Sequence, residues 1–178
     1  FDNIRYKGIS DIRIEDINYS NKLGYKIKLI SKSEIINNKI SSFVEPILID
    51  KNSQLANVND VLNAVKVETD HLESLFLVGE GAGGKATSSS VISDIFELAC
   101  GVNIPSLGFK NSELINIENI DYNDRNTSFY LRITVKDIPG VLAKITSNLN
   151  EEGISIETIL QMPENKINKN EVSIIITT

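Results

Sequence analysis

The sequence predicts an α+β fold, mostly antiparallel sheet with helices, and two observations lead to this prediction. Several short segments alternate apolar and polar residues with the period of a strand, as residues 25–31 do. Two longer segments, 87–101 and 137–153, repeat apolar residues at helical spacing and end at a glycine. An antiparallel sheet with one or two helices on one face accommodates this mixture.

Charge and hydropathy argue against several classes of protein. The chain has 178 residues, with 18 Lys or Arg against 24 Asp or Glu, so its net charge is −6. This acidic balance argues against nucleic acid as a partner and against a basic anchor on an acidic membrane. No apolar run approaches the roughly 18–20 residues of a membrane-spanning helix. Hydrophobic residues make up 41%, which is enough for a packed core.

One cysteine and one histidine limit the redox and metal chemistry. Cys100 cannot form a disulfide within the chain, so we expect a reducing, cytoplasmic environment. Cys100 and His71 cannot build a zinc site by themselves, so no metal is expected. Cys100 ends an apolar helical segment and is expected to be buried, whereas His71 lies in a turn and is expected to be exposed. Because the chain starts at Phe1 with neither initiator methionine nor signal peptide, we expect a piece of a longer protein.

The first region, 1–78, is predicted to combine strands with short turns and helices. A short helix is expected at 16–23, because Gly24 follows it as a helix-ending glycine. Pro46 is expected to interrupt a strand, which suits an edge or a bulge. The expected strands are a pattern at Ile9, Ile12 and Ile14, then 25–31, 39–50, 63–68 and 74–78, with a turn and helix at 54–62.

The strand at 25–31 is expected to have one buried face. Its alternation places Ile27 and Leu29 on that face. Lys26 and Lys28 then lie on the opposite face, and we expect them to be solvated.

A glycine-rich turn at 79–87 follows a strand and precedes a helix. We expect Thr87 to cap this helix, its hydroxyl accepting a backbone N–H. Glycine at Gly81 and Gly83 lets backbone N–H groups approach a ligand, and the helix adds a positive N-terminal end. The alternative is a tight strand-to-helix turn, and the spacing alone leaves both open. The pattern is not the G-x-G-x-x-G of a dinucleotide-binding unit.

The third region begins after a segment rich in asparagine and acids. A strand at 129–135 precedes a helix, with Asp137 expected near its N-cap and Pro139 in its first turn. Two further strands are expected at 154–162 and 171–178, separated by a polar turn. The resulting order is β-α-β-β, whereas a ferredoxin-like unit needs one more helix and strand, so we expect this unit to be truncated.

Two parts of the chain together resemble one enzyme family. Residues 8–29 and the segment from Asn63 through 79–87 resemble the later part of the substrate and dimerisation domain of homoserine dehydrogenases. Ala86 stands where that family usually has proline, and Ser88 where it usually has alanine. Residues 130–178 resemble an ACT domain, the amino-acid-sensing module, by the strand followed by Asp137, Ile138, Pro139, Gly140, Val141 and Leu142.

The resemblance implies a domain organisation. Residues 1–101 would form the later part of the substrate and dimerisation domain, including the glycine turn and the helix that follows it. Residues 102–127 would be a linker, and residues 128–178 a partial ACT regulatory domain. The fold class is then an antiparallel α+β domain followed by a truncated ferredoxin-like ACT domain.

The resemblance also implies a reaction. The family interconverts L-homoserine and L-aspartate 4-semialdehyde with NAD or NADP, on the route to threonine, methionine and isoleucine. Its nucleotide-binding domain and its catalytic lysine and aspartate lie earlier in the chain, and nothing here matches them. No catalytic residue is therefore expected in this chain, which alone should be inactive and bind no cofactor. In the intact enzyme, Gly81, Ala82, Gly83 and Thr87 are expected to contact the cofactor.

The ACT resemblance implies regulation by a free amino acid, with threonine the first candidate. The expected effector residues are Asp137, Ile138, Pro139, Gly140, Val141 and Leu142, where a carboxylate can bind the helix N-terminus. These residues also start a helix, and that simpler role stays open. The resemblance implies a homo-oligomer, and an open sheet edge favours self-association. The alternatives are a stand-alone amino-acid-binding regulator and a structural dimerisation module.

Overall fold

The computed structural model describes residues 4–102, 108–121, 127–168 and 170–178. The chain divides into two compact units, one made of Phe1–Asp50 with Asn119–Thr178 and the other of Lys51–Glu118. Helices and mainly antiparallel sheets confirm the predicted α+β class. The predicted linker falls partly on 103–107 and 122–126, which lie outside the described residues; its described part contains one 3-10 turn, Asn111–Glu113.

The first unit contains a long antiparallel hairpin. Strands β2 (Tyr25–Ile36) and β3 (Lys39–Asp50) pair over twelve residues each, and β1 (Arg5–Tyr6) lies parallel to β3 on its other side. The two-residue turn between β2 and β3 has φ values of 50° and 62° at Asn37 and Asn38, a conformation that asparagine tolerates. The hairpin therefore extends the predicted strand at 25–31 by five residues.

Three expectations for this region are wrong: the strand at the first isoleucines, the single buried face of residues 25–31, and the interruption of a strand at Pro46. Ile9 lies in a bend and Ile14 begins a helix, so no strand forms at the first isoleucines. Leu29 is 50% exposed while Lys26 and Lys28 are half-buried, so the alternation does not separate a core face from a solvated lysine face.

Pro46 does not interrupt β3, which runs on past it and pairs it with Leu29. The pairing with β1 stops at Val44, so no described strand covers that side of β3 at the proline. Proline has no N–H to donate, so a sheet tolerates it at such an edge position.

Helix α1 (Ile14–Lys22) matches the short helix predicted at 16–23. It ends where Gly24 takes a positive φ of 87°, as the helix-ending glycine predicted. Its burial is unusual, because Asp16, Tyr19 and Ser20 are buried on one face while Ile14 and Ile17 are exposed.

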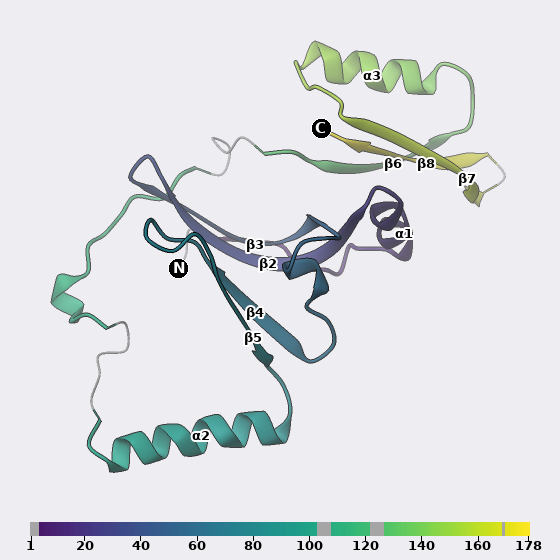
Figure 1. The fold of residues 1–178 in the computed structure, drawn as a ribbon. Coiled ribbons are helices and arrows are strands. Elements are labelled where there is room, and N and C mark those ends of the chain that lie inside the picture. The colour runs from purple at the N-terminus through teal and green to yellow at the C-terminus, as the bar shows by residue number, and fades with distance from the viewer. Residues whose placement is uncertain (1–3, 103–107, 122–126, 169) are drawn as a thin grey trace. The chain divides into compact units, whose positions relative to one another are not determined.

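The remainder of the first unit has the predicted β-α-β-β order. Its sheet runs β6-β8-β7, antiparallel throughout, with β8 in the centre. Figure 1 shows α3 on one side of this sheet and α1 on the other. The elements are β6 (Tyr130–Lys136), α3 (Val141–Glu151), β7 (Thr158–Asn168) and β8 (Glu171–Thr177).

Strand β8 forms the core of this sheet because both of its faces are covered. Ile174 and Ile176 pack toward Ile145 and Leu149 of α3. Ile175, on the other face, packs with Tyr19 of α1. The two faces of β8 pack into different apolar clusters, so α3 and α1 are stabilised by alternate residues of the same segment.

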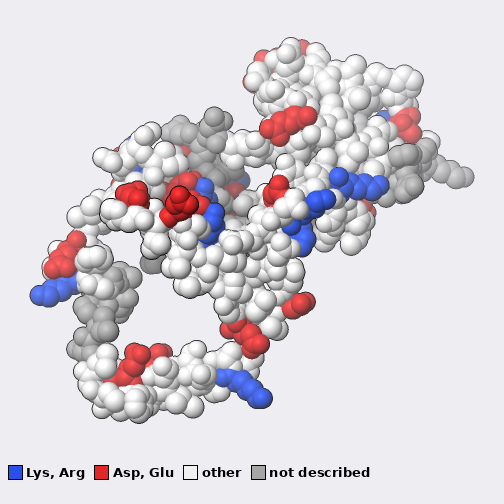
Figure 2. Space-filling view, in the orientation of Figure 1, with Lys and Arg blue, Asp and Glu red and all other residues white. Residues whose placement is uncertain are grey.

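The second unit is a hairpin followed by a long helix. The hairpin strands β4 and β5 are antiparallel and close to the predicted 63–68 and 74–78, and a 3-10 turn precedes them. In Figure 2 the surface of α2 is mostly white, with acidic side chains gathered in its later part. The elements are η1 (Leu55–Asn57), β4 (Leu62–Val67), β5 (Leu75–Glu80) and α2 (Gly84–Ala99).

The apolar stripe of α2 is exposed in this structure. Its members are all more than half exposed, and they are Val91, Ile92, Ile95, Phe96 and Leu98. Cys100 at its end is exposed as well, so the expected burial of this thiol is wrong. The helical periodicity identified the helix but could not identify what its apolar face packs against. His71 is exposed, as predicted.

Within the described residues, no helix combines the length and the apolar character needed to cross a bilayer. No three His, Cys, Asp or Glu side chains among them are grouped so that they could hold a metal ion.

Candidate functional site

The glycine turn, residues 81–83, connects β5 to α2. Gly83 is the N-cap, with a φ of 121° that residues with a Cβ rarely adopt, and α2 begins at Gly84. Thr87 lies one turn inside the helix, where its N–H donates to the Gly83 carbonyl at 3.0 Å. The prediction that Thr87 caps the helix is therefore wrong. The positive φ at Gly83 turns the chain early enough for Lys85 and Ala86, good helix formers, to join the first turn.

Gly81 is needed for a contact within the chain. A Cβ on Gly81 would overlap the Asn63 side-chain amide, with the Asn63 Cγ only 2.5 Å away. The Gly81 N–H also donates to the Val61 carbonyl at 3.0 Å, which ties the end of β5 to the start of β4. Close backbone approach at Gly81 thus has a structural reason that requires no ligand.

We expect Gly81→Ala to destabilise the second unit, because the added methyl must displace Asn63 or shift the backbone. Overpacking of this kind costs about 1–3 kcal/mol. The matched control is Gly84→Ala, since a Cβ there meets nothing within 4 Å and Gly84 is the first helical residue. Denaturant unfolding should show a loss for Gly81→Ala and none for Gly84→Ala; equal stability of the two variants would contradict the clash.

The predicted cofactor-binding residues lie on an exposed part of the glycine turn and the start of α2. Gly81, Ala82, Gly83 and Thr87 are exposed, and a Cβ on Gly83 would meet nothing within 4 Å, so the backbone there is open to a ligand. The N–H groups of Gly81 and Thr87 donate within the chain, so the turn offers a ligand the N–H groups of Ala82 and Gly83 and the Thr87 hydroxyl, which supply a single wall and do not enclose a dinucleotide.

The predicted effector loop, residues 137–142, connects β6 to α3. Gly140 is the N-cap of α3, with a φ of 90°, and the helix begins at Val141. Asp137 and Pro139 precede the N-cap, so their predicted positions at the cap and in the first turn are wrong. The Asp137 N–H instead donates to the Asn170 carbonyl at 2.9 Å, which holds the loop against the turn between β7 and β8.

Four of the six predicted effector residues lie in the exposed loop 137–140, and the other two, Val141 and Leu142, lie in the first turn of α3. Ile138 and Leu142 expose more than a third of their surface. The loop directly follows the end of β6 at Lys136. Gly140 is the residue with the strictest conformational requirement, because its left-handed φ disfavours any side chain.

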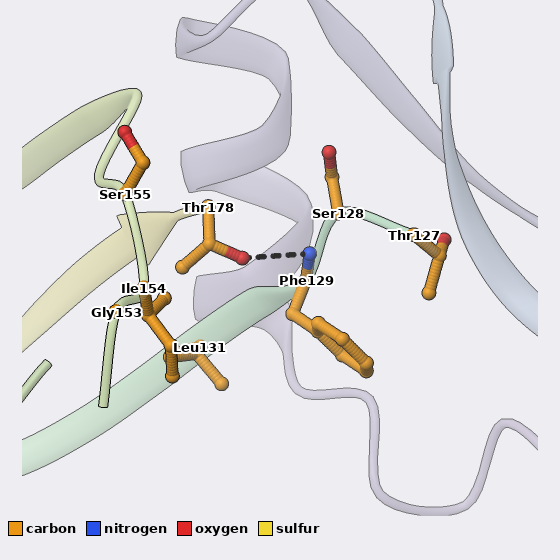
Figure 3. A pocket seen from close by; sticks show the side chains of 8 residues that line it. All are labelled: Thr127, Ser128, Phe129, Leu131, Gly153, Ile154, Ser155 and Thr178. Carbon is orange, nitrogen blue, oxygen red and sulfur yellow. Dashed lines mark hydrogen bonds between the residues drawn. The ribbon is translucent and has the colours of Figure 1, made fainter. Parts of the chain in front are cut away.

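An open cavity of about 590 Å³ lies at the other end of β6 and α3. Figure 3 shows the Phe129 N–H donating to Thr178 Oγ1, a distance of 3.1 Å, at its rim. None of the predicted effector residues lines it. The lining consists of Thr127, Ser128, Phe129, Leu131, Gly153, Ile154, Ser155 and Thr178. Sequence reasoning missed this cavity because its lining carries no charged or otherwise distinctive side chain.

A buried polar cluster links α1 to β6, and we call Asp16, Tyr130 and Arg132 the Asp16 cluster. The Asp16 Oδ1 atom accepts from the Tyr130 hydroxyl at 2.8 Å and from Arg132 Nε at 2.7 Å. Its Oδ2 atom accepts from the Arg13 backbone N–H at 2.8 Å. Asp16 is 2% exposed, and the Arg132 side chain is 18% exposed.

The environment of Tyr130 strongly favours its neutral form. Burial raises the pKa of the Tyr130 hydroxyl well above its usual range, and the hydrogen bond that it donates to Asp16 raises it further. The nearby Arg132 guanidinium acts in the opposite direction but is the weaker influence. Tyr130 is therefore a fixed hydrogen-bond donor to Asp16.

Tyr130 should remain protonated where an ordinary tyrosine, with a pKa of about 10, ionises. Because the folded-state pKa is above the unfolded value, the stability this residue contributes is fully present below about pH 10 and is lost as the pH rises beyond it. An ultraviolet titration of the folded chain should show the same tyrosinate amplitude near pH 10 for wild type and for Tyr130→Phe. A smaller amplitude in the variant would show that Tyr130 ionises normally.

Sequence reasoning also missed the Asp16 cluster, although a signal was present. Tyr130 and Arg132 alternate with Leu131 along β6, so they lie on the face opposite Leu131, where polar residues are ordinarily assumed to be solvated. The run of three isoleucines in β8 indicates a strand covered on both faces. Together these patterns point to a second element on the polar face of β6.

Comparison with known proteins assigns two segments of the chain to known families. The family model described as homoserine dehydrogenase matches residues 1–96, and the one described as ACT domain matches residues 129–178. Among curated homoserine dehydrogenases, that of Pseudomonas aeruginosa is 36% identical over 167 residues, 90% of this chain and 38% of its own length. That of Bacillus subtilis is 35% identical over 167 residues, 91% of this chain and 38% of its own length.

Solved structures show the same relationship. A homoserine dehydrogenase from Thiobacillus denitrificans superposes with a TM-score of 0.79 at 33% identity, covering 97% of this chain and 40% of its own. One from S. aureus gives a TM-score of 0.62 at 29% identity, covering 98% of this chain and 41% of its own. The chain thus spans about two fifths of the length of these relatives. It belongs to the homoserine dehydrogenase family, and its residues 129–178 form an ACT domain.

Proposed function

We propose that this chain is part of an oxidoreductase that interconverts L-homoserine and L-aspartate 4-semialdehyde with NAD or NADP. The match of a homoserine dehydrogenase segment and an ACT domain, in that order along one chain, is the observation that carries this proposal. The relatives' names give the enzyme class, and amino-acid biosynthesis follows from the role of that enzyme. The proposed location is the cytoplasm, because it suits both such a reaction and a single reduced thiol.

Within such an enzyme, this chain would supply subunit contacts, one wall of the active site and regulation. The glycine turn would present Gly81, Ala82, Gly83 and Thr87 to the cofactor, which supplies or accepts the hydride when bound. Its exposed backbone and the N-terminus of α2 would position that ligand. The domain boundaries we propose are 1–101, 102–127 and 128–178. Alone, the chain should not turn over homoserine.

The ACT domain would sense a free amino acid at the effector loop, with L-threonine the first candidate. The loop ends at the N-terminus of α3, where backbone N–H groups attract a carboxylate. Gly140 allows this close approach because it has no side chain and adopts a left-handed φ. An assembly of two or more copies is the proposed state of the protein.

Calorimetric titration of the chain with L-threonine, L-isoleucine, L-methionine and glycine tests the regulatory role. We expect saturable binding of one of them, threonine first, and no oxidation of homoserine in a parallel assay that follows reduced nicotinamide. Turnover would contradict the inactivity of the chain alone. Absence of binding would contradict the sensing role and favour a structural dimerisation module.

Two glycine variants locate the site. Gly140→Ala should weaken threonine binding about tenfold or more, because a side chain at a left-handed φ costs roughly 1–2 kcal/mol and deforms the loop. The matched control is Gly153→Ala at the opposite end of α3, where φ is 71° and a Cβ likewise meets nothing within 4 Å. Weaker binding in Gly153→Ala instead would assign the ligand to the cavity of Figure 3.

A further inference from the structure

Helix α1 contacts the ACT sheet through the polar Asp16 and the aromatic Tyr19. Asp16, Tyr19 and Ser20 lie on the same face of α1, at i, i+3 and i+4, and all three are buried. Ile14 and Ile17, the aliphatic residues of the helix, are 65% and 43% exposed. An ordinary amphipathic helix buries the opposite set. The docking of α1 therefore depends on specific polar partners rather than on apolar area alone.

The polar partners define a single docked position. The two oxygens of Asp16 accept three hydrogen bonds, from Tyr130, Arg132 and the Arg13 backbone. The Tyr19 hydroxyl donates to the Ser173 carbonyl in β8 at 3.3 Å. A buried carboxylate shifted by even part of a turn would keep the Arg13 donor, which belongs to the N-cap of α1, but would lose the Tyr130 and Arg132 donors in a region with little water. Intermediate positions of α1 are therefore disfavoured relative to fully docked and fully released ones.

The Asp16 cluster lies where the two matched segments of the chain meet. Asp16 belongs to the segment that matches homoserine dehydrogenase, and Tyr130 and Arg132 belong to the ACT domain. On one side, β6 runs from Arg132 to the effector loop at Asp137, about 17 Å along an extended strand. On the other side, α1 continues through Gly24 directly into β2. Strand β6 thus connects the effector loop to the Asp16 cluster, and helix α1 connects the cluster to β2.

We propose that α1 is the coupling element between the ACT domain and the homoserine dehydrogenase segment, held on the ACT sheet by the Asp16 cluster. Docked and released α1 are the two states, and a ligand at the effector loop shifts their balance through β6. Asp16 and Arg132 act as positioning residues. The ligand part of this proposal rests on the proposed function, whereas the docking part rests on the contacts alone.

The competing interpretation is that the cluster is ordinary core. In that case α1 and β8 would open together, and no ligand signal would pass between them. Amide hydrogen exchange distinguishes the two interpretations because it reports the opening of each element separately.

The first arm compares exchange in wild type and three variants of the full chain. In Arg132→Met, amides of α1 should exchange about tenfold faster or more and become the least protected of the three elements, while those of β8 and α3 remain protected although the whole chain is less stable. Tyr130→Phe, which keeps the ion pair, should show a smaller change in the same direction. This second variant still tests the proposal if Arg132→Met fails to fold. The control Lys32→Gln breaks the exposed Lys32–Glu34 ion pair of 2.7 Å and should change amide exchange in neither α1 nor α3.

Two results of this arm would overturn the proposal. One is unchanged exchange of α1 in both cluster variants. The other is the same residual protection in α1 and β8, which is the behaviour of a common core.

The second arm repeats the measurement with saturating L-threonine. In wild type, threonine should change exchange in the effector loop and in α1, whereas in Arg132→Met it should change only the loop. A response of the loop without α1 in wild type would contradict the coupling and leave the proposed function intact. No response anywhere would contradict the proposed function, and the docking of α1 would then be decided by the first arm.

Discussion

Replacing Arg132 with methionine is expected to lower the free energy of unfolding of the chain by about 3–5 kcal/mol. The substitution keeps much of the apolar volume but leaves the Asp16 carboxylate buried without its charged partner. Asp16 Oδ1 would retain only the Tyr130 hydroxyl as a donor. A buried charge with fewer donors is among the few single changes that cost this much.

The measurement is denaturant unfolding followed by circular dichroism, with a double variant as internal test. Asp16→Leu combined with Arg132→Met should be more stable than Arg132→Met alone, because no unpaired charge remains buried. The control Lys32→Gln, which breaks an exposed pair, should change stability by less than about 1 kcal/mol. A loss in Arg132→Met no larger than in Lys32→Gln would show that the cluster contributes little.

Truncating either of two neighbouring isoleucines in β8 should lower the free energy of unfolding by a similar amount. The two truncations should loosen different helices. Ile175 is 1% exposed and packs with α1, whereas Ile176 is 0% exposed and packs in the cluster that includes α3. Replacing either by alanine is expected to cost about 2–5 kcal/mol through lost burial and a residual cavity.

Hydrogen exchange under native conditions separates the two variants. Ile175→Ala should increase exchange mainly in α1, and Ile176→Ala mainly in α3, because adjacent residues of a strand face opposite sides. Each variant serves as the control of the other, since the strand and the substitution are the same. If the two variants gave the same pattern of exchange, β8 would not separate two distinct cores.

Much of the secondary structure follows from periodicity and from glycine. The β-α-β-β order was predictable because each strand has enough apolar residues and each helix ends at a glycine with positive φ, as at Gly24 and Gly153. The long hairpin was only half predictable. Its second half, 32–36, lacks regular alternation and is stabilised by pairing with β3 rather than by a buried face.

The helix starts were wrong for one physical reason. Capping preferences favoured Thr87 and Asp137, whose side chains accept hydrogen bonds from a helix N-terminus. In both cases a glycine occupies the N-cap, Gly83 and Gly140, because the chain reverses there with a positive φ. The backbone conformation required by the turn outweighed the side-chain preference.

The candidate sites were predictable to different degrees. The effector loop and the glycine turn lie in short segments whose residue types suggest ligands, so sequence motifs found them. The Asp16 cluster joins residues more than a hundred positions apart, and each member alone resembles an ordinary surface residue. Only the fold brings them together.

The most direct test of amino-acid sensing is the amide spectrum of the chain, recorded by nuclear magnetic resonance during titration with L-threonine. Saturable shifts are expected in the effector loop, 137–142, with smaller ones at Tyr130 and Arg132 on β6. Shifts confined to the cavity around Phe129 and Gly153, or no saturable shifts at all, would contradict an effector site at the loop between β6 and α3.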